Sequence, residues 1–205
     1  MDAYTHFKLN AAPFEGKPDP RFYYELPYHA ESLATLQYAV HTAKSCCLVL
    51  GESGSGKTLL ARLLAESVNR RCRILWAHGI GQPAGATELT IYPPGTLCGT
   101  RTLGRIRPQS STLGAWMRSA VPPTSSSVII IDNADGLNRQ NWEDVLTLVT
   151  HEFRASKAYT LILLGLPILA ARMGSRGLMR VRRRVFRTCQ LPGLTRPQAD
   201  RKSVV

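Results

Sequence analysis

Residues 51–58 combine glycines with a lysine and a threonine in a pattern suited to holding phosphate groups. The run reads Gly51-Glu52-Ser53-Gly54-Ser55-Gly56-Lys57-Thr58 and fits the spacing G-x-x-x-x-G-K-[ST]. Its glycines let the backbone wrap tightly, so successive N–H groups point at a bound anion. We expect Lys57 to reach the β- and γ-phosphates and the Thr58 hydroxyl to take a position on Mg²⁺. The run therefore predicts binding of ATP or a closely related nucleoside triphosphate, with Mg²⁺.

An acidic residue follows the most apolar strand-like segment of the chain. Residues 128–131 read Val-Ile-Ile-Ile, which fits a strand buried on both faces. Asp132 comes directly after them and should lie at the carboxyl edge of a parallel sheet, beside the phosphate loop. There it would hold Mg²⁺ through water, together with Thr58.

The next residue departs from many ATPases of this type, which carry glutamate at this point to activate the attacking water. This chain has Asn133, whose amide can position water but cannot accept its proton. Asp135 could take that part only if the turn brings it back towards the loop. We expect ATP binding, with Lys57, Asp132 and Asn133 in the catalytic region, and leave hydrolysis open.

The elements that must position these residues alternate between strands and helices. Short apolar runs predict strands at 45–50, 73–77, 128–131, 159–164 and 185–191. Apolar residues at helical spacing predict helices at 29–44, 59–68 and 142–153, and an arginine-rich helix precedes the last strand. This alternation predicts an α/β fold with a parallel sheet sandwiched between helices and right-handed crossovers.

Two segments do not fit this alternation. The first, up to about Tyr28, is rich in proline and aromatic residues, so it cannot be a long helix. We expect it to be an extended arm lying against the main domain. The second, His78–Pro123, is rich in Gly, Pro, Ser and Thr. Apart from a helix around Leu113–Ala120, we expect an irregular insertion there.

The composition sets the class of protein. With 205 residues, 44% of them hydrophobic, the chain can bury one core, and its apolar runs are too short to span a membrane. No signal peptide is visible, so we expect a cytoplasmic location. The five cysteines lack metal-ligand spacing.

The formal net charge is +12 and is unevenly distributed, because no acidic residue occurs between Glu152 and Asp200. Arginines crowd this segment at 172, 176, 180, 182, 183, 184 and 187. They form either a solvated helix that partly serves the triphosphate or a contact surface for nucleic acid, acidic lipid or an acidic partner.

Taken together, these features resemble the AAA+ ATPases of the general secretion pathway protein A (ExeA-like) family. The similarity covers about residues 4–195, with a poor stretch at 79–112. The matching segments are Pro13-Phe14, Pro18-Asp19-Pro20-Arg21-Phe22-Tyr23, His29-x-Glu31-x-Leu33 with Leu36 and Tyr38, and Gly165-Leu166-Pro167-Ile168-Leu169.

The resemblance implies an AAA+ P-loop core with an extended N-terminal arm, and a homo-oligomer when nucleotide is bound. The arm and the helix at His29 would flank the adenine, so His29 and Leu59 join residues 51–58 as expected nucleotide-binding residues. Arg183 or Arg184, just before the last strand, would act as the finger that reaches a neighbouring subunit's γ-phosphate. We take Arg184 as the catalytic one; the alternative is an arginine that only solvates the helix end.

The chain also departs from that family. Leu166 stands where the family commonly has a polar sensor glutamine, and the sequence stops shortly after the last strand, where a helical lid should begin. We expect an arm at 1–28, an AAA+ nucleotide-binding domain at 29–191 and the stub of a truncated lid at 192–205.

Three functions remain open. The first is an ATPase that drives or regulates assembly of a secretion or pilus machine, with a secretion-apparatus protein as partner. The second is a DNA-associated transposition helper ATPase, which the charge favours. The third is a non-hydrolysing nucleotide-dependent switch or scaffold, suggested by Asn133 and Leu166.

Overall fold

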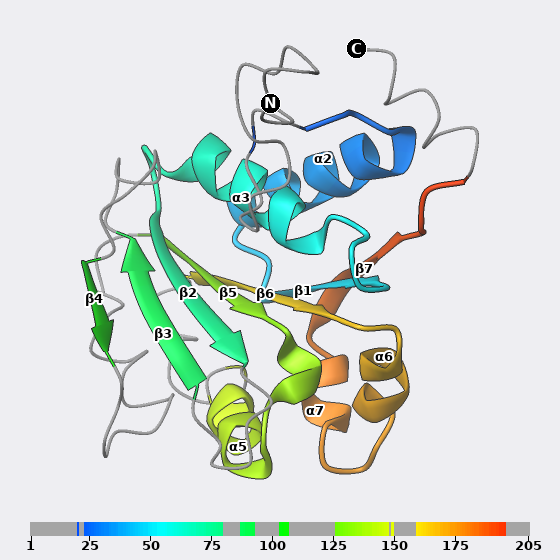
Figure 1. Cartoon of the computed structure of the whole chain (residues 1–205). Coiled ribbons are helices and arrows are strands. Elements are labelled where there is room, and N and C mark those ends of the chain that lie inside the picture. The colour runs from blue at the N-terminus through cyan, green and yellow to red at the C-terminus, as the bar shows by residue number, and fades with distance from the viewer. Residues whose placement is uncertain are drawn as a thin grey trace, which may run out of the picture.

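The computed structural model describes residue 20 and residues 23–79, 87–92, 103–106, 126–147, 149 and 159–195; for 79, 87–92 and 103–106 it describes the backbone only. These ranges form a sheet with helices on both faces (Figure 1). The strands are β1 Cys46–Gly51, β2 Arg73–Gly79, β3 Thr87–Tyr92, β4 Leu103–Ile106, β5 Ser127–Asp132, β6 Tyr159–Gly165 and β7 Val185–Leu191. The helical elements are α2 Pro27–His41, α3 Lys57–Val68, η2 Ala134–Gly136 (a 3₁₀ turn), α5 Arg139–Thr147, α6 Ile168–Met173 and α7 Met179–Arg182.

The order of the strands brings the expected functional residues to one edge of the sheet. Within the described ranges the sheet has seven strands in the order β4-β3-β2-β5-β6-β1-β7. Strands β2, β5, β6, β1 and β7 run parallel, whereas β3 pairs antiparallel with β2 and β4 antiparallel with β3. Because β5, β6 and β1 are neighbours, the loops that leave their carboxyl ends lie side by side.

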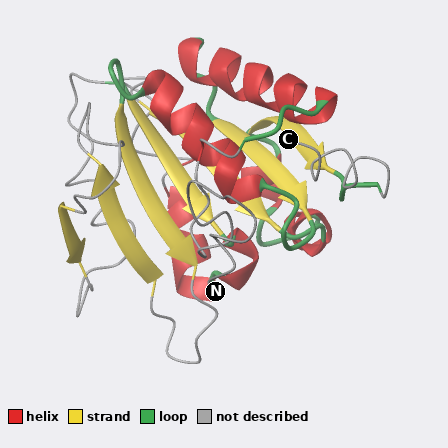
Figure 2. Cartoon of the chain, turned by 45° about the horizontal axis from the view of Figure 1, so that its top comes forward, coloured by secondary structure: helices red, strands yellow, loops and turns green. Residues whose placement is uncertain are grey.

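The helices cover the two faces of the parallel strands. Figures 1 and 2 show α2 and α3 on one face, and α5, α6 and α7 on the other. Alternation along β1 divides its side chains between the two cores: Cys47 and Val49 pack with α2 and α3, and Cys46, Leu48 and Leu50 pack with α5, α6 and α7. All six residues of β1 are buried, which makes this strand a rigid base for the loop that follows.

Most of the predicted elements are confirmed to within a few residues. The strand predicted at 185–191 has these same bounds, and the other predicted strands are each extended or shifted slightly. Helix α2 begins at Pro27 rather than at residue 29, because proline is well tolerated in a first helical turn.

Two predictions about secondary structure are wrong. The segment 78–123 is not simply an irregular insertion, because β3 and β4 extend the sheet from it. Pairing with β2 stabilises β3. Because this contact is long-range, the segment can form a strand although its own sequence has only a weak strand pattern. The arginine-rich segment forms two short helices, α6 and α7, rather than one, with the turn Gly174–Leu178 between them.

Some predictions fall outside the described residues. These are most of the arm, the helix at Leu113–Ala120 and the end of the helix predicted at 142–153. The same holds for residues 196–205 of the segment 192–205, predicted as the stub of a lid. In the part of the chain that the structure describes, no helix is both long enough and apolar enough to cross a membrane.

Candidate functional site

The loop between β1 and α3 has the backbone that its glycines predict. Gly54 and Gly56 have φ values of 78° and 90°, in the left-handed region where a side chain would be strained. Gly51 is constrained by space instead: a Cβ there would collide with the Ser55 Oγ and lie 2.7 Å from the carbonyl oxygen of Leu191. Each of these glycines therefore has a physical role in the turn.

The Lys57 side chain folds back into this loop. Its Nζ donates hydrogen bonds to the carbonyl oxygens of Gly51 and Glu52, both at 2.8 Å. An ammonium group has three donors, so one remains for an anion in the loop. Burial lowers the pKa of Lys57, and this effect is opposed by the negative charges of Asp132, Asp135 and Glu52.

Thr58 and Asp132 meet although they are far apart in the sequence. The Thr58 Oγ1 donates a hydrogen bond of 2.8 Å to the Asp132 Oδ2, and Asp132 is only 1% exposed. The other carboxylate oxygen, Oδ1, accepts a hydrogen bond of 3.0 Å from the backbone N–H of Asn133. A hydroxyl and a carboxylate are thus held together beside the phosphate loop, an oxygen pair of the kind that Mg²⁺ prefers.

Asn133 extends from the end of β5 with a backbone φ of 54°, which asparagine tolerates better than most residues. Its side-chain Nδ2 donates a hydrogen bond of 3.0 Å to the Nε2 of His78. The Nδ1 of the same ring lies 3.7 Å from the Asp132 Oδ2. His78 pairs with Asp132 in the β2–β5 register, so it belongs to the same sheet edge. Sequence reasoning missed His78; its position at the end of a strand was the available signal.

Asp135 returns to the site by way of the η2 turn. Its Oδ1 accepts a hydrogen bond of 2.9 Å from the backbone N–H of Leu166, the residue after β6. Arg172 on α6 fixes the same turn, because its guanidinium donates to the carbonyl oxygens of Asp135 at 2.7 Å and Leu137 at 3.2 Å. Arg172 therefore serves the turn.

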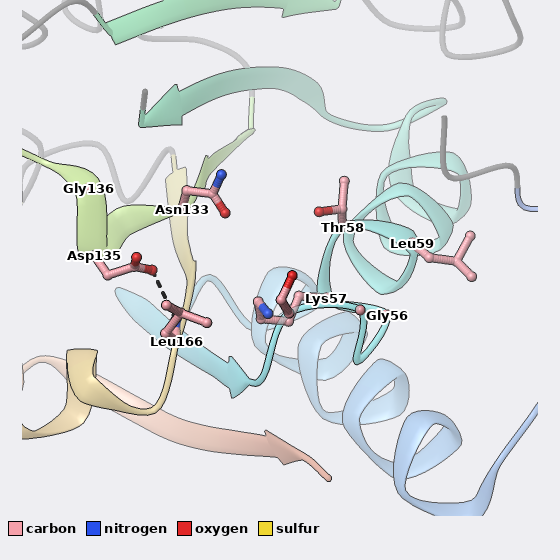
Figure 3. Close-up of a pocket in the computed structure, with 10 residues that line it drawn as sticks. Gly56, Lys57, Thr58, Leu59, Asn133, Asp135, Gly136 and Leu166 are labelled. Atoms are coloured by element: carbon pink, nitrogen blue, oxygen red, sulfur yellow. Dashed lines mark hydrogen bonds between the residues drawn. The ribbon is translucent and has the colours of Figure 1, made fainter. Parts of the chain in front are cut away.

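Ten residues of this region line one cavity of about 610 Å³, which is within the size range of small-molecule sites; Asp132 and His78 are not among them. The lining residues are Ser53, Gly54, Gly56, Lys57, Thr58, Leu59, Asn133, Asp135, Gly136 and Leu166. Figure 3 shows the Asp135–Leu166 hydrogen bond, whereas the Leu59 side chain points away from the other labelled residues. Gly136 was not predicted, and only its place next to Asp135 could have indicated it.

His29 supports the loop from α2 and is not among the residues that line the cavity. Its Nε2 donates a hydrogen bond of 3.1 Å to the carbonyl oxygen of Ser55, and a Cβ at Gly56 would lie 3.4 Å from the same nitrogen. The ring packs against Tyr28 with 4.6 Å between centroids, and Tyr23 lies at 6.2 Å. His29 thus contacts the phosphate loop from α2, through the backbone of Ser55.

Arg184 lies at the opposite end of the sheet from the cavity. It directly precedes Val185, which pairs with Cys46 at the start of β1, whereas the phosphate loop follows the end of that strand. Burial raises the pKa of Tyr159 to about 12, and the nearby Arg184 partly offsets this increase. Arg184 is not among the residues that line the cavity of its own chain.

Comparisons with known proteins bear on the family and the fold. Residues 40–173 match the family described as AAA domain. Among curated proteins, the general secretion pathway protein A of Aeromonas hydrophila is 34% identical over 74 residues, which are 36% of this chain and 14% of that protein.

Solved structures share the fold at low sequence identity. The ORC2 protein of Aeropyrum pernix, solved in ADPNP–ADP complexes, has a TM-score of 0.58 and 16% identity over 85% of this chain and 50% of its own. Cdc6p of Pyrobaculum aerophilum has a TM-score of 0.57 and 15% identity over 99% of this chain and 54% of its own. A point variant of Thermotoga maritima RuvB has a TM-score of 0.54 and 16% identity over 87% of this chain and 49% of its own. This chain spans about half the length of these structures, which identify its fold as that of the AAA+ P-loop NTPases.

Proposed function

Because this chain belongs to the AAA domain family, we propose that its cavity binds ATP with Mg²⁺ and that the bound ATP is hydrolysed. The observation that carries this proposal is the Thr58–Asp132 hydrogen bond of 2.8 Å beside the buried Lys57. This hydrogen bond brings together the two residues that are expected to hold Mg²⁺, although they are far apart in the sequence. The match of residues 40–173 to the AAA domain family also supports nucleotide binding.

The donor set fits Mg²⁺ shared with a nucleotide. In the described ranges, no three His, Cys, Asp or Glu side chains converge as a metal site of their own. Thr58 and Asp132 would instead hold the ion together with phosphate oxygens and water, as Mg²⁺ sites commonly do. When bound, the ion neutralises charge that develops on the phosphates.

Residues of this chain would contact the phosphates, position the attacking water and accept its proton. Lys57 contributes a positive charge, and the backbone N–H groups of the loop and of the first turn of α3 face the phosphates. Asn133 lines the cavity and would position the attacking water through its amide. Asp135 also lines the cavity, and its carboxylate would accept the proton that Asn133 cannot take.

Arg184 would act on a neighbouring copy of the chain. Its place at the far end of β1 from its own cavity supports a role between subunits. An arginine supplied across an interface stabilises the charge of the transition state and makes hydrolysis depend on assembly. We propose a homo-oligomer in the nucleotide-bound state for this reason.

The proposed role of the ATPase is to drive or regulate assembly of a secretion or pilus-type machine. Its support is the 34% identity with a general secretion pathway protein A over 74 residues. A DNA-associated transposition helper ATPase is the second candidate, favoured by the net charge of +12. A non-hydrolysing switch is the third, favoured by Asn133 and Leu166 in the cavity lining.

The test measures ATP binding and phosphate release separately. We expect wild type to bind a fluorescent ATP analogue in a Mg²⁺-dependent manner and to release phosphate. Lys57→Met should lose both activities, whereas Arg139→Ala, on the exposed surface of α5, should lose neither. Tight Mg²⁺-dependent binding with no phosphate release at any protein concentration would establish the switch instead. Absence of binding would overturn the proposal.

A further inference from the structure

Two exposed aromatic side chains meet where α2 crosses the edge strand β7. Tyr38 is 55% exposed and Phe186 is 36% exposed. Their ring centroids lie 6.1 Å apart. Large exposed aromatic side chains that touch one another indicate a binding surface more often than a solitary exposed residue does.

Two positive charges lie next to the Phe186 ring of this pair. The Lys44 Nζ lies 5.2 Å from the centroid of the Phe186 ring, and the Arg187 guanidinium carbon lies 5.9 Å from it. Both distances are within the range of cation–π contacts, which hold the two cations over the ring. We call these four residues, Tyr38, Lys44, Phe186 and Arg187, the aromatic–cationic patch.

The patch continues into a positively charged part of the chain. Residues 159–195 contain no acidic side chain. Arg182 and Arg183, which are exposed, precede β7 and extend the positive surface towards α7. Within the described ranges, the acidic residue of α2 is Glu31, which lies about 10 Å along the same helix face from Tyr38 and acts electrostatically on Cys189 of β7, so the patch residues face one carboxylate among several cations. The surface therefore favours a polyanion.

The patch also lies apart from the nucleotide cavity. Lys44 precedes β1, and Arg187 pairs with Cys47 near the start of that strand, whereas the phosphate loop follows its end. β7 is the last strand of the sheet order, so its outer side has no neighbouring strand among the described residues. A ligand on the patch would leave the cavity accessible.

We propose that the aromatic–cationic patch binds single-stranded nucleic acid, with bases stacking on Tyr38 and Phe186 and with Lys44 and Arg187 contacting phosphates. Stacking on aromatic rings next to cations is how proteins hold unpaired bases without reading their sequence. A duplex hides the faces of its bases, so the aromatic pair favours a single strand. The proposal goes beyond the ATPase function and does not depend on it.

The experiment is fluorescence anisotropy with labelled oligo(dT) of about 20 nucleotides, enough to cover one binding site, an RNA of equal length and a duplex DNA. We expect the two single strands to bind more tightly than the duplex. Phosphate contacts by Lys44 and Arg187 predict a slope of about −1.4 for log K against log salt concentration, and further contacts by Arg182 and Arg183 would make it about −2.8. DNA and RNA share the chemistry recognised here, and the two single-stranded probes tell them apart.

Variants then separate stacking from charge. Phe186→Ala and Tyr38→Ala should each weaken single-strand binding by about 5- to 100-fold, as loss of one stacked base does. Arg187→Ala should weaken it and also flatten the salt dependence. The matched control is Arg139→Ala, because Arg139 is 94% exposed on another helix and paired with Glu143. A thermal unfolding midpoint equal to that of wild type shows that each variant is folded.

Several results would overturn the proposal. No binding of either single strand at low salt would do so, as would equal losses in the patch variants and in Arg139→Ala. Equal affinity for duplex DNA with no effect of the aromatic substitutions would reduce the patch to a general cationic surface. Binding to vesicles of anionic lipid, lost in the patch variants while oligonucleotides fail to bind, would assign the patch to a membrane surface. None of these outcomes bears on ATP binding, which is measured separately.

Discussion

The Nδ2 of Asn133 lies 3.0 Å from the Nε2 of His78 and donates a hydrogen bond to it, across the carboxyl ends of β5 and β2. The same imidazole places its Nδ1 3.7 Å from the Asp132 Oδ2. The amide that occupies the position of a catalytic glutamate is thus held by a ring that also approaches the expected magnesium ligand. This contact orients the Asn133 side chain, whose amide would position water without accepting its proton.

Asn133→Glu should raise ATP turnover, because it adds a proton acceptor at the edge of the cavity. We expect an increase of about two orders of magnitude if proton transfer limits the rate. Glutamate tolerates the left-handed backbone less well than asparagine, so the variant should lose roughly 1 kcal/mol of stability.

Asn133→Gln is the control for this prediction, since it has the same length and backbone strain but no basic group. Phosphate release and thermal unfolding are measured for both variants. Equal rates in wild type, Asn133→Glu and Asn133→Gln would mean that assembly, rather than the base, limits turnover.

Asp135→Asn should lower turnover by about 100-fold if Asp135 accepts the proton, with little change in ATP affinity. The amide keeps an oxygen that can accept the hydrogen bond from the Leu166 N–H, so the turn should survive. Steady-state phosphate release gives kcat, and titration with the fluorescent analogue gives Kd. A wild-type kcat in this variant would remove Asp135 from the mechanism.

Thr58→Val should abolish the effect of Mg²⁺ on ATP affinity, because valine has the shape of threonine without its hydroxyl. It also leaves the buried Asp132 Oδ2 without its Thr58 donor, at a cost of about 1–3 kcal/mol in stability. Thr58→Ser keeps the hydroxyl and should retain the Mg²⁺ effect. Titrations with and without EDTA test this; a Mg²⁺ response in Thr58→Val equal to that of wild type would contradict it.

Arg184→Ala should lower turnover by about 1,000-fold and leave ATP binding intact, since the arginine acts on a neighbouring copy. Arg180→Ala, in the exposed part of α7, is the matched control. Mixing Arg184→Ala with Asp135→Asn should restore part of the turnover, because Asp135→Asn subunits still bind ATP and still carry Arg184 for the intact cavities. Wild-type turnover in Arg184→Ala alone would show that Arg184 only solvates its helix end.

The buried thiols should make the fold sensitive to alkaline pH. Burial raises the pKa of Cys47 to about 12, and it also raises the pKa values of Cys46, Cys72 and Cys189. In the unfolded chain these thiols ionise near pH 9, so the stability that they contribute is complete below that pH and is lost as the pH rises towards 12.

Urea unfolding between about pH 8 and pH 11, a range that spans the ionisation of the unfolded thiols, measures this loss. A Cys98→Ser background removes the one cysteine outside the described residues. The same four thiols should react slowly with a thiol reagent until the protein unfolds, because the thiolate is the reactive form. Rapid labelling of the native protein would contradict the burial of these side chains.

The sequence by itself determined the parts of the site that depend only on residues adjacent to one another in the sequence. The glycines of the phosphate loop need only the local backbone to specify their turn, and the β-branched run before Asp132 specifies a buried strand. The parallel arrangement followed, because alternating strands and helices permit few topologies. These features made the loop, Asp132 and most of the strands predictable.

Only the tertiary structure decided how the distant residues contact one another, including the direct hydrogen bond within the predicted pair Asp132 and Thr58. The order β5-β6-β1 brings Asp132 within 2.8 Å of Thr58, and the η2 turn carries Asp135 to the Leu166 N–H. The β2–β5 register sets His78 beside Asp132, and pairing with β2 forms β3 from a segment with little pattern of its own. Each of these contacts joins strands or loops that are separate in the sequence. Register and strand order arise from the packing of the whole sheet, so no local pattern could have specified them.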